Sequence, residues 1–202
     1  LLLVWLFSAV IGVGVAARLF PAEFESRTIF PLLAKPVTRG RIVLGKYLGA
    51  LAASVSALTV FYLAYGVLCG LRQSVWFPVV LFQAFLLHIG FLIVVTALAM
   101  LGSLMMTPSA NLTLCGLLIV GMLVFGQRLP SLIAAQPYPG KAFLMLVHAL
   151  GPHVEFFDLR QRVIHGWSRV GWDVCAVVLL YAIGYAAACL GLAGWLFCRK
   201  KV

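Results

Sequence analysis

The stretch that decides the fold is residues 73–127, which reads QSVWFPVVLFQAFLLHIGFLIVVTALAMLGSLMMTPSANLTLCGLLIVGMLVFGQ. Its 55 residues include no Asp, Glu, Lys or Arg. A helix needs only about 20 apolar residues to cross a bilayer, so the stretch is long enough for two crossings. Pro108 has no N–H to continue a helix, and it disfavours helical geometry at Thr107. The stretch therefore predicts two helices, Val79–Met106 and Leu112–Phe125.

Three further uncharged stretches predict helices at about Leu1–Ala17, Leu48–Gly70 and Asp173–Phe197. The whole chain of 202 residues is 64% hydrophobic and 10% charged, with a mean hydropathy of +1.11. A soluble domain is about 25% charged, so this composition excludes a water-soluble globule. In lipid, every backbone N–H and C=O must be satisfied internally, which long apolar runs achieve as helices. We expect an all-α, polytopic transmembrane helical bundle with five spans, forming a single domain over residues 1–202.

The basic residues predict the orientation of the bundle. The net charge is +10, which in a soluble protein would suggest nucleic acid, but here we assign it to orientation and to membrane lipids, with no nucleic-acid partner. Five crossings place residues 18–47 and the C-terminal tail on one side, with nine basic and two acidic residues. The other side has six basic and three acidic residues. Because cytoplasmic loops are enriched in Lys and Arg, residues 18–47 are expected to be cytoplasmic, in a multi-pass protein of the cell membrane.

The outer connection, residues 126–172, contains residues 142–154, which are uncharged but too short to cross a bilayer. We expect an interfacial helix there. The same connection holds residue types that can ligate a metal, but their spacing matches no known ligand pattern, and we predict no metal site: His148, His153, Glu155, Asp158 and His165. The five cysteines form no CxxC pair, and we predict no cofactor in this chain.

Residues 40–46 match the G-x-x-x-x-G-K part of a phosphate-binding loop. Such a loop also needs Ser or Thr after the Lys and a strand before the loop. Tyr47 follows Lys46 here, and the residues between the two glycines are largely apolar. Any ATP chemistry is therefore expected on another polypeptide.

His88 is the ionisable residue deep in a predicted span, and such residues are candidates for function. It is either a helix-to-helix hydrogen-bonding group or, as a less favoured reading, the base of an intramembrane hydrolase. Candidate serines for that hydrolase are Ser54, Ser56 and Ser103, but no nucleophile-elbow or HExxH pattern accompanies them.

Small residues at helical spacing predict close helix packing. Gly66 and Gly70 form a GxxxG pair, and Gly184, Ala188 and Gly191 form a second stripe. Packing within one chain is the favoured use, and contact in a dimer is the alternative.

The connection formed by residues 18–47 predicts a short amphipathic helix beginning near Pro21. Proline suits a first helical turn, and Glu23 and Glu25 suit a helix N-terminus. Lys35-Pro36 is expected to end this helix. The residues leave two uses open: a helix bound to the lipid surface, or a docking element for a soluble partner.

This connection resembles the signature of type-2, export-type ABC transporter permeases. The matching residues are Glu25-Ser-Arg-Thr-Ile, then Leu32-Leu-Ala-Lys-Pro-Val-Thr-Arg-Gly-Arg, then Leu44-Gly-Lys-Tyr-Leu-Gly. A weaker resemblance covers Gly151–His165. In that family the connection includes the coupling helix that contacts a separate ATPase subunit. The resemblance implies contact residues at these positions: Glu23, Glu25, Arg27, Lys35, Arg39, Arg41 and Lys46.

The resemblance implies a permease subunit that exports an unidentified substrate and that pairs with a second copy. The chain itself is not expected to be an enzyme. The family has six spans, so the first span of the family is expected to be missing from the N-terminal end of this sequence. The alternative function is a membrane-embedded assembly or scaffold protein without a transport cycle.

Overall fold

A computed structural model describes residues 1–26, 38–73, 76–128, 131, 133–134, 137–138 and 140–199. Within these ranges the secondary structure is helical, without strands. The long helices are α1 (Leu2–Glu25), α3 (Arg39–Gln73), α4 (Val79–Ser103), α5 (Pro108–Phe125) and α9 (Trp172–Arg199). Shorter elements lie between α5 and α9: η1 (Gly126–Arg128), α7 (Gly140–Leu150), η2 (Val154–Phe157) and α8 (Arg160–Ile164).

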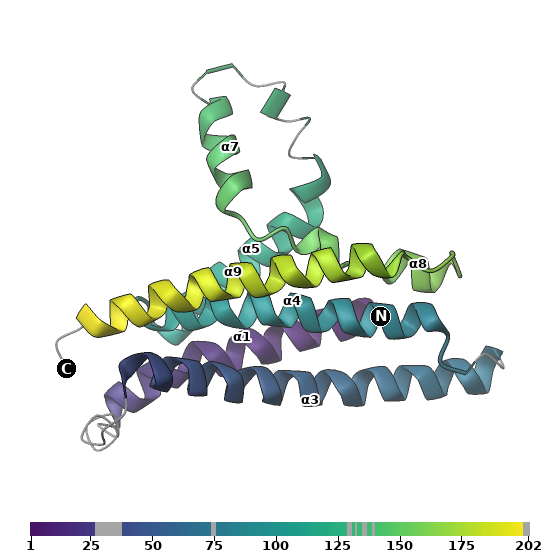
Figure 1. The fold of residues 1–202 in the computed structure, drawn as a ribbon, viewed down its shortest axis with the longest axis horizontal. Coiled ribbons are helices and arrows are strands. Elements are labelled where there is room, and N and C mark those ends of the chain that lie inside the picture. Colours follow the sequence, from purple (N-terminus) through teal and green to yellow (C-terminus); the bar gives the residue numbers. More distant parts are fainter. Residues whose placement is uncertain are drawn as a thin grey trace.

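All five long helices of the described residues are long and apolar enough to cross a membrane. They lie roughly side by side, and α1 begins in the half of the bundle that lies away from the end where α9 ends (Figure 1). An odd number of alternating helices produces this arrangement. The predicted all-α polytopic bundle is confirmed.

Helix α4 is the central helix of the bundle. In its most apolar part 67% of the residues are buried, against 39% in α1 and 22% in each of α3, α5 and α9. Its fully buried side chains contact α1 on one side and α9 on another, so α4 is apolar all round, as expected for a helix that other helices surround. The peripheral helices expose many large apolar side chains, which a lipid environment accommodates.

Helix α1 is longer than the sequence predicts. It continues through Pro21 and ends at Glu25, so Pro21 does not begin a separate amphipathic helix and Glu23 and Glu25 lie in the last turn of α1. Proline removes one backbone donor, and membrane helices tolerate this where neighbouring groups compensate. The rest of the predicted coupling helix, with Arg27 and Lys35, lies outside the described residues.

Three other boundaries differ from the prediction. Helix α3 covers Arg39–Gln73, so it begins well before the predicted start at Leu48. Helix α4 ends at Ser103, and α5 begins at Pro108, whose fixed φ suits the first helical position after an extended Thr107. The predicted proline break is therefore real, but the proline starts the next helix instead of lying between helices.

The outer segment forms the predicted helix as α7, although α7 covers Gly140–Leu150 and not residues 142–154. Figure 1 shows α7 standing away from the long helices, with the chain returning to the bundle at η2 and α8. Phe157 of η2 is buried against Gly90 of α4, where an added Cβ would lie 2.9 Å from the ring. The absence of a side chain on Gly90 lets η2 close over α4.

The two small-residue motifs do not pack helix against helix within the described residues. Gly66 and Gly70 face the aromatic rings of Phe77 and Trp76, which come from the loop before α4. The stripe of Gly184, Ala188 and Gly191 lies on the exposed face of α9. Loop side chains lie against the first motif, and contact with another molecule stays a prediction for the second.

One interior contact tests this packing directly. The Asn111 amide donates to the Ala99 carbonyl at 2.8 Å, and the Asn111 side chain lies where a Cβ on Gly102 would be. We expect Gly102→Ala to displace Asn111, break this buried hydrogen bond and destabilise the bundle by about 1–3 kcal/mol. Thermal unfolding of the purified protein in detergent measures the effect. Gly49→Ala is the control, because nothing lies within 4 Å of a Cβ there, and an equal loss in both variants would contradict the contact.

Candidate functional site

A polar cluster lies inside the bundle around His88, which is fully buried on α4. Its Nε2 lies 2.7 Å from the Ser8 hydroxyl of α1, and its Nδ1 lies 3.3 Å from the Tyr62 hydroxyl of α3. The Trp5 ring packs on the imidazole at a centroid distance of 4.7 Å. The His88 imidazole thus links α4 to both α1 and α3.

One His88 tautomer lets all the contacts of this cluster be hydrogen bonds at once, and we infer that tautomer. The Ser8 hydroxyl donates to the Trp5 carbonyl at 3.0 Å, so it accepts at its oxygen from His88 Nε2–H. The Tyr62 hydroxyl then donates to Nδ1. Every donor has an acceptor, and His88 is neutral in this arrangement.

This assignment disfavours the hydrolase interpretation. A general base needs a free lone pair facing the nucleophile, whereas His88 presents a proton to Ser8. The serines proposed from sequence donate to carbonyls of their own helices: Ser54 to Ala50, Ser56 to Ala53 and Ser103 to Met100. Ser8 was missed as a partner because it lies 80 residues from His88 and carries no motif.

The outer segment covers the cluster. Arg160 binds Asp158 through two side-chain hydrogen bonds of 2.8 and 2.7 Å. The Arg160 guanidinium also lies 5.2 Å from the Trp5 ring centroid, in the range of a cation–π contact. Trp5 therefore lies between the imidazole and an ion pair, and α8 is held on the bundle above His88.

The residues considered as metal ligands are distributed in separate contacts. Asp158 pairs with Arg160, and His165 bonds to Gln161 at 3.1 Å. His148 and His153 stack on each other at 4.6 Å. Among the residues that the structure describes, no three His, Cys, Asp or Glu side chains form a group that could hold a metal ion.

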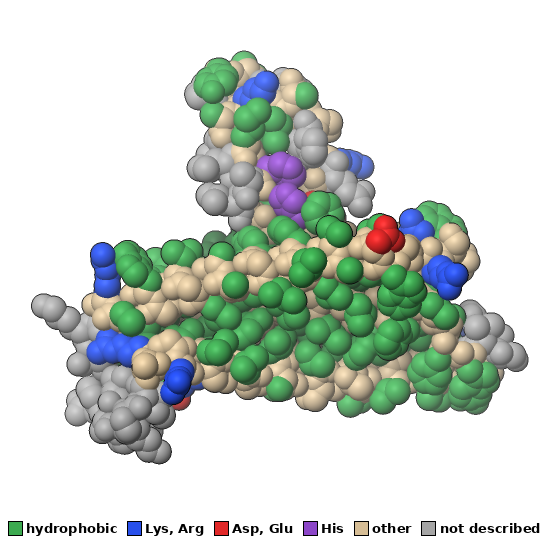
Figure 2. Space-filling view, viewed as in Figure 1, with side chains coloured by type: hydrophobic (Ala, Val, Ile, Leu, Met, Phe, Trp, Pro, Cys, Tyr) green, Lys and Arg blue, Asp and Glu red, His purple; other side chains and the backbone are tan. Residues whose placement is uncertain are grey.

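Charged side chains gather at the end of the bundle where α1 and α9 end and α3 begins, which we call the basic end. Figure 2 shows Lys and Arg at both ends of the long helices, with hydrophobic side chains between them. At the basic end, Lys46 of α3 pairs with Glu23 of α1. Arg39 donates to the carbonyls of Phe197 and Cys198 at 2.9 and 3.2 Å, and so caps α9.

These contacts divide the residues predicted to contact an ATPase into those bound within the chain and those that are exposed. Glu23, Arg39 and Lys46 bind within the chain and join α1, α3 and α9. Glu25 and Arg41 are exposed. Residues 40–46 lie in the first turns of α3 and are helical.

The fold and this site define a polytopic membrane protein of the α-helical class, with a sealed polar interior and a charged end. A family model described as "ABC-2 family transporter protein" matches residues 3–202, and the chain belongs to this family. It is therefore a membrane permease component of an ABC transporter. Comparison with curated proteins and with solved structures gives no match.

The proton assignment in the His88 cluster can be tested with Ser8→Ala. This change leaves the Nε2–H of His88 without an acceptor in an apolar interior, and we expect a loss of stability of about 1–3 kcal/mol. Thermal unfolding in detergent measures it. Ser56→Ala is the matched control because the Ser56 hydroxyl is exposed and binds its own helix. An unchanged midpoint for Ser8→Ala would show that the assigned bond is not made.

Proposed function

We propose that this chain is the membrane-spanning subunit of an ABC exporter, powered by a separate ATPase subunit that docks at the basic end. Two copies of the chain form the transport path. The membership of residues 3–202 in the ABC-2 transporter family carries the proposal. The basic end supports it because it joins three helices whose ends move together if a partner pushes on any of them.

The contacts of the basic end suggest how a displacement of one helix is transmitted to the others. The Lys46–Glu23 pair ties α3 to α1, and the Arg39 cap ties α3 to α9. Phe20, Val43 and Phe197 pack in one apolar cluster just inside these charges. A displacement of the α1–α3 connection therefore reaches α9 directly through the Arg39 cap, in addition to any path through α4.

The same contacts separate docking residues from structural ones. Glu25 and Arg41 are exposed at the basic end and are the described residues proposed to meet the ATPase directly. Arg39 contributes to docking indirectly, because its hydrogen bonds hold the end of α9 against α3. Arg27 and Lys35 remain proposed contacts in the same connection.

Arg41→Glu tests docking. We expect co-purification of the ATPase subunit to fall by about tenfold, because a reversed charge at an interface both loses an attraction and adds a repulsion. The thermal midpoint of the permease alone should not change. Arg39→Glu should lower both the midpoint and ATPase binding. Arg128→Glu, exposed in η1 at a distance from the basic end, is the control. Full ATPase binding by Arg41→Glu would remove Arg41 from the interface. Absence of any co-purifying ATPase with the unaltered chain would favour a scaffold protein without a transport cycle.

The orientation has its own test. We propose that the basic end faces the cytoplasm of a cell membrane, as the excess of Lys and Arg there favours. Cys198 is exposed at this end. In a Cys69→Ser background, a membrane-impermeant maleimide should label Cys198 only after cell lysis. A cysteine at the exposed position Tyr138, introduced as Tyr138→Cys in the outer segment, should be labelled in intact cells. The reverse pattern would place the proposed ATPase site on the wrong side.

A further inference from the structure

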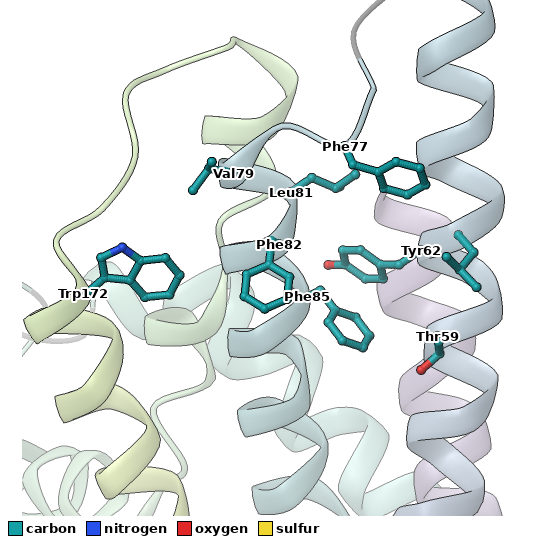
Figure 3. Close-up of a pocket in the computed structure, with 9 residues that line it drawn as sticks. Thr59, Tyr62, Phe77, Val79, Leu81, Phe82, Phe85 and Trp172 are labelled. Atoms are coloured by element: carbon teal, nitrogen blue, oxygen red, sulfur yellow. The ribbon is translucent and has the colours of Figure 1, made fainter.

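A groove of about 550 Å³ opens on the side of the bundle between α3, α4 and the start of α9. Figure 3 shows aromatic side chains from all three helices around it. Its lining is almost entirely apolar: Thr59, Tyr62, Leu63, Phe77, Val79, Leu81, Phe82, Phe85 and Trp172. It lies in the half of the bundle opposite the basic end, since α3 begins at Arg39 and ends at Gln73.

Contacts between elements keep the groove open. Phe77 has a left-handed backbone with φ 44°, which is uncommon for a bulky residue, and its ring packs on Gly66 of α3. On the other wall, the Gln83 side-chain amide donates to the Val170 carbonyl at 2.8 Å and accepts from the Val170 N–H at 3.1 Å. This pair of hydrogen bonds holds the start of α9 beside α4. The groove is therefore part of the folded structure and not a gap between loosely packed helices.

The hydroxyl groups of two lining residues, Tyr62 and Thr59, are engaged in hydrogen bonds within the protein. The Tyr62 hydroxyl bonds His88 in the interior, and its ring packs edge-on against Phe85 at 5.3 Å. The Thr59 hydroxyl bonds the Val55 carbonyl of its own helix at 2.8 Å. A ligand in the groove meets an almost entirely hydrocarbon surface, which disfavours polar ligands in its interior.

The rim of the groove carries charged side chains, in contrast to its apolar interior. Helix α3 is about 50 Å long at 1.5 Å per residue, whereas the hydrocarbon core is about 30 Å thick, so the last turn of α3 lies at headgroup level. Arg72 is exposed in that turn, and Arg169 is exposed next to the Gln83 contact. Trp172 lines the groove, and Trp76 packs on Gly70 near the end of α3, where tryptophan favours the membrane interface. Asp173 is the acidic residue on α9 at this rim, so the positive charges exceed the negative ones.

We propose that this groove binds a phospholipid of the surrounding bilayer, with one acyl chain against Phe82 and Phe85 and the phosphate near Arg72 and Arg169. A bilayer supplies this molecule at high concentration along the whole exposed side of the bundle. The combination of an apolar groove with a basic, tryptophan-flanked rim matches an acyl chain joined to a phosphate. The two arginines favour an anionic headgroup. The inference does not depend on the docking of an ATPase.

Native mass spectrometry of the purified full chain with phosphatidylglycerol or phosphatidylcholine tests this site. Thr59→Phe fills the groove, and we expect one fewer tightly bound lipid. Val60→Phe is the matched control, because Val60 is the next residue, is exposed and does not line the groove. Thermal unfolding of both variants checks that they are folded. Equal lipid retention by the two variants would overturn the proposal.

The headgroup is tested separately. Arg72→Gln with Arg169→Gln should lower the preference for phosphatidylglycerol over phosphatidylcholine by about fivefold for each charge, while Arg128→Gln should not change it. An unchanged preference would overturn the assignment of the phosphate to this rim. A change in oligomeric state in Thr59→Phe at constant lipid per chain would assign the groove to a second copy of the protein and would also overturn the proposal.

Discussion

The absence of water in the hydrocarbon core constrains every polar group in this bundle. Among the described residues, buried polar side chains of the core bond to partners on other elements: His88 to Ser8, Asn111 to the Ala99 carbonyl and Gln83 to the Val170 carbonyl. An unsatisfied group there costs more than a made bond gains, so these contacts select the register in which helices meet. Apolar packing alone would allow neighbouring registers, because lipid tails solvate Leu and Val as well as another helix does.

The His88 cluster gives this constraint a structural consequence. It joins α1, α3 and α4 at one point, and Arg160 covers it from the outer segment through Trp5. A helix cannot slide along its axis without separating at least one of these pairs. The half of the bundle opposite the basic end is thus held by short polar contacts, whereas the basic end is held by charges near water, which are weaker and more readily exchanged.

The spans were predictable because absence of charge over about 20 residues is a local property of the chain. His88 was recognisable for the same reason, since an ionisable residue in such a run is conspicuous. Its partners were not, because the pairing of Ser8 with His88 depends on which faces of α1 and α4 meet. The GxxxG pair Gly66 and Gly70 was visible, but its occupant depends on a left-handed backbone at Phe77 that no local pattern predicts.

The charged residues near α3 show a further limit of local reasoning. Arg39 and Lys46 belong to the motif that indicated a docking element, yet both bind within the chain. A motif records that a residue type is needed at a position and not which partner needs it. In this bundle Arg39 satisfies the last carbonyls of α9, which would otherwise lack donors at a helix end. Residues that hold α1, α3 and α9 together can therefore carry the same motif as residues that a partner would contact. Since Arg39 is bound at the end of α9, it links α3 to a helix that is far away in sequence.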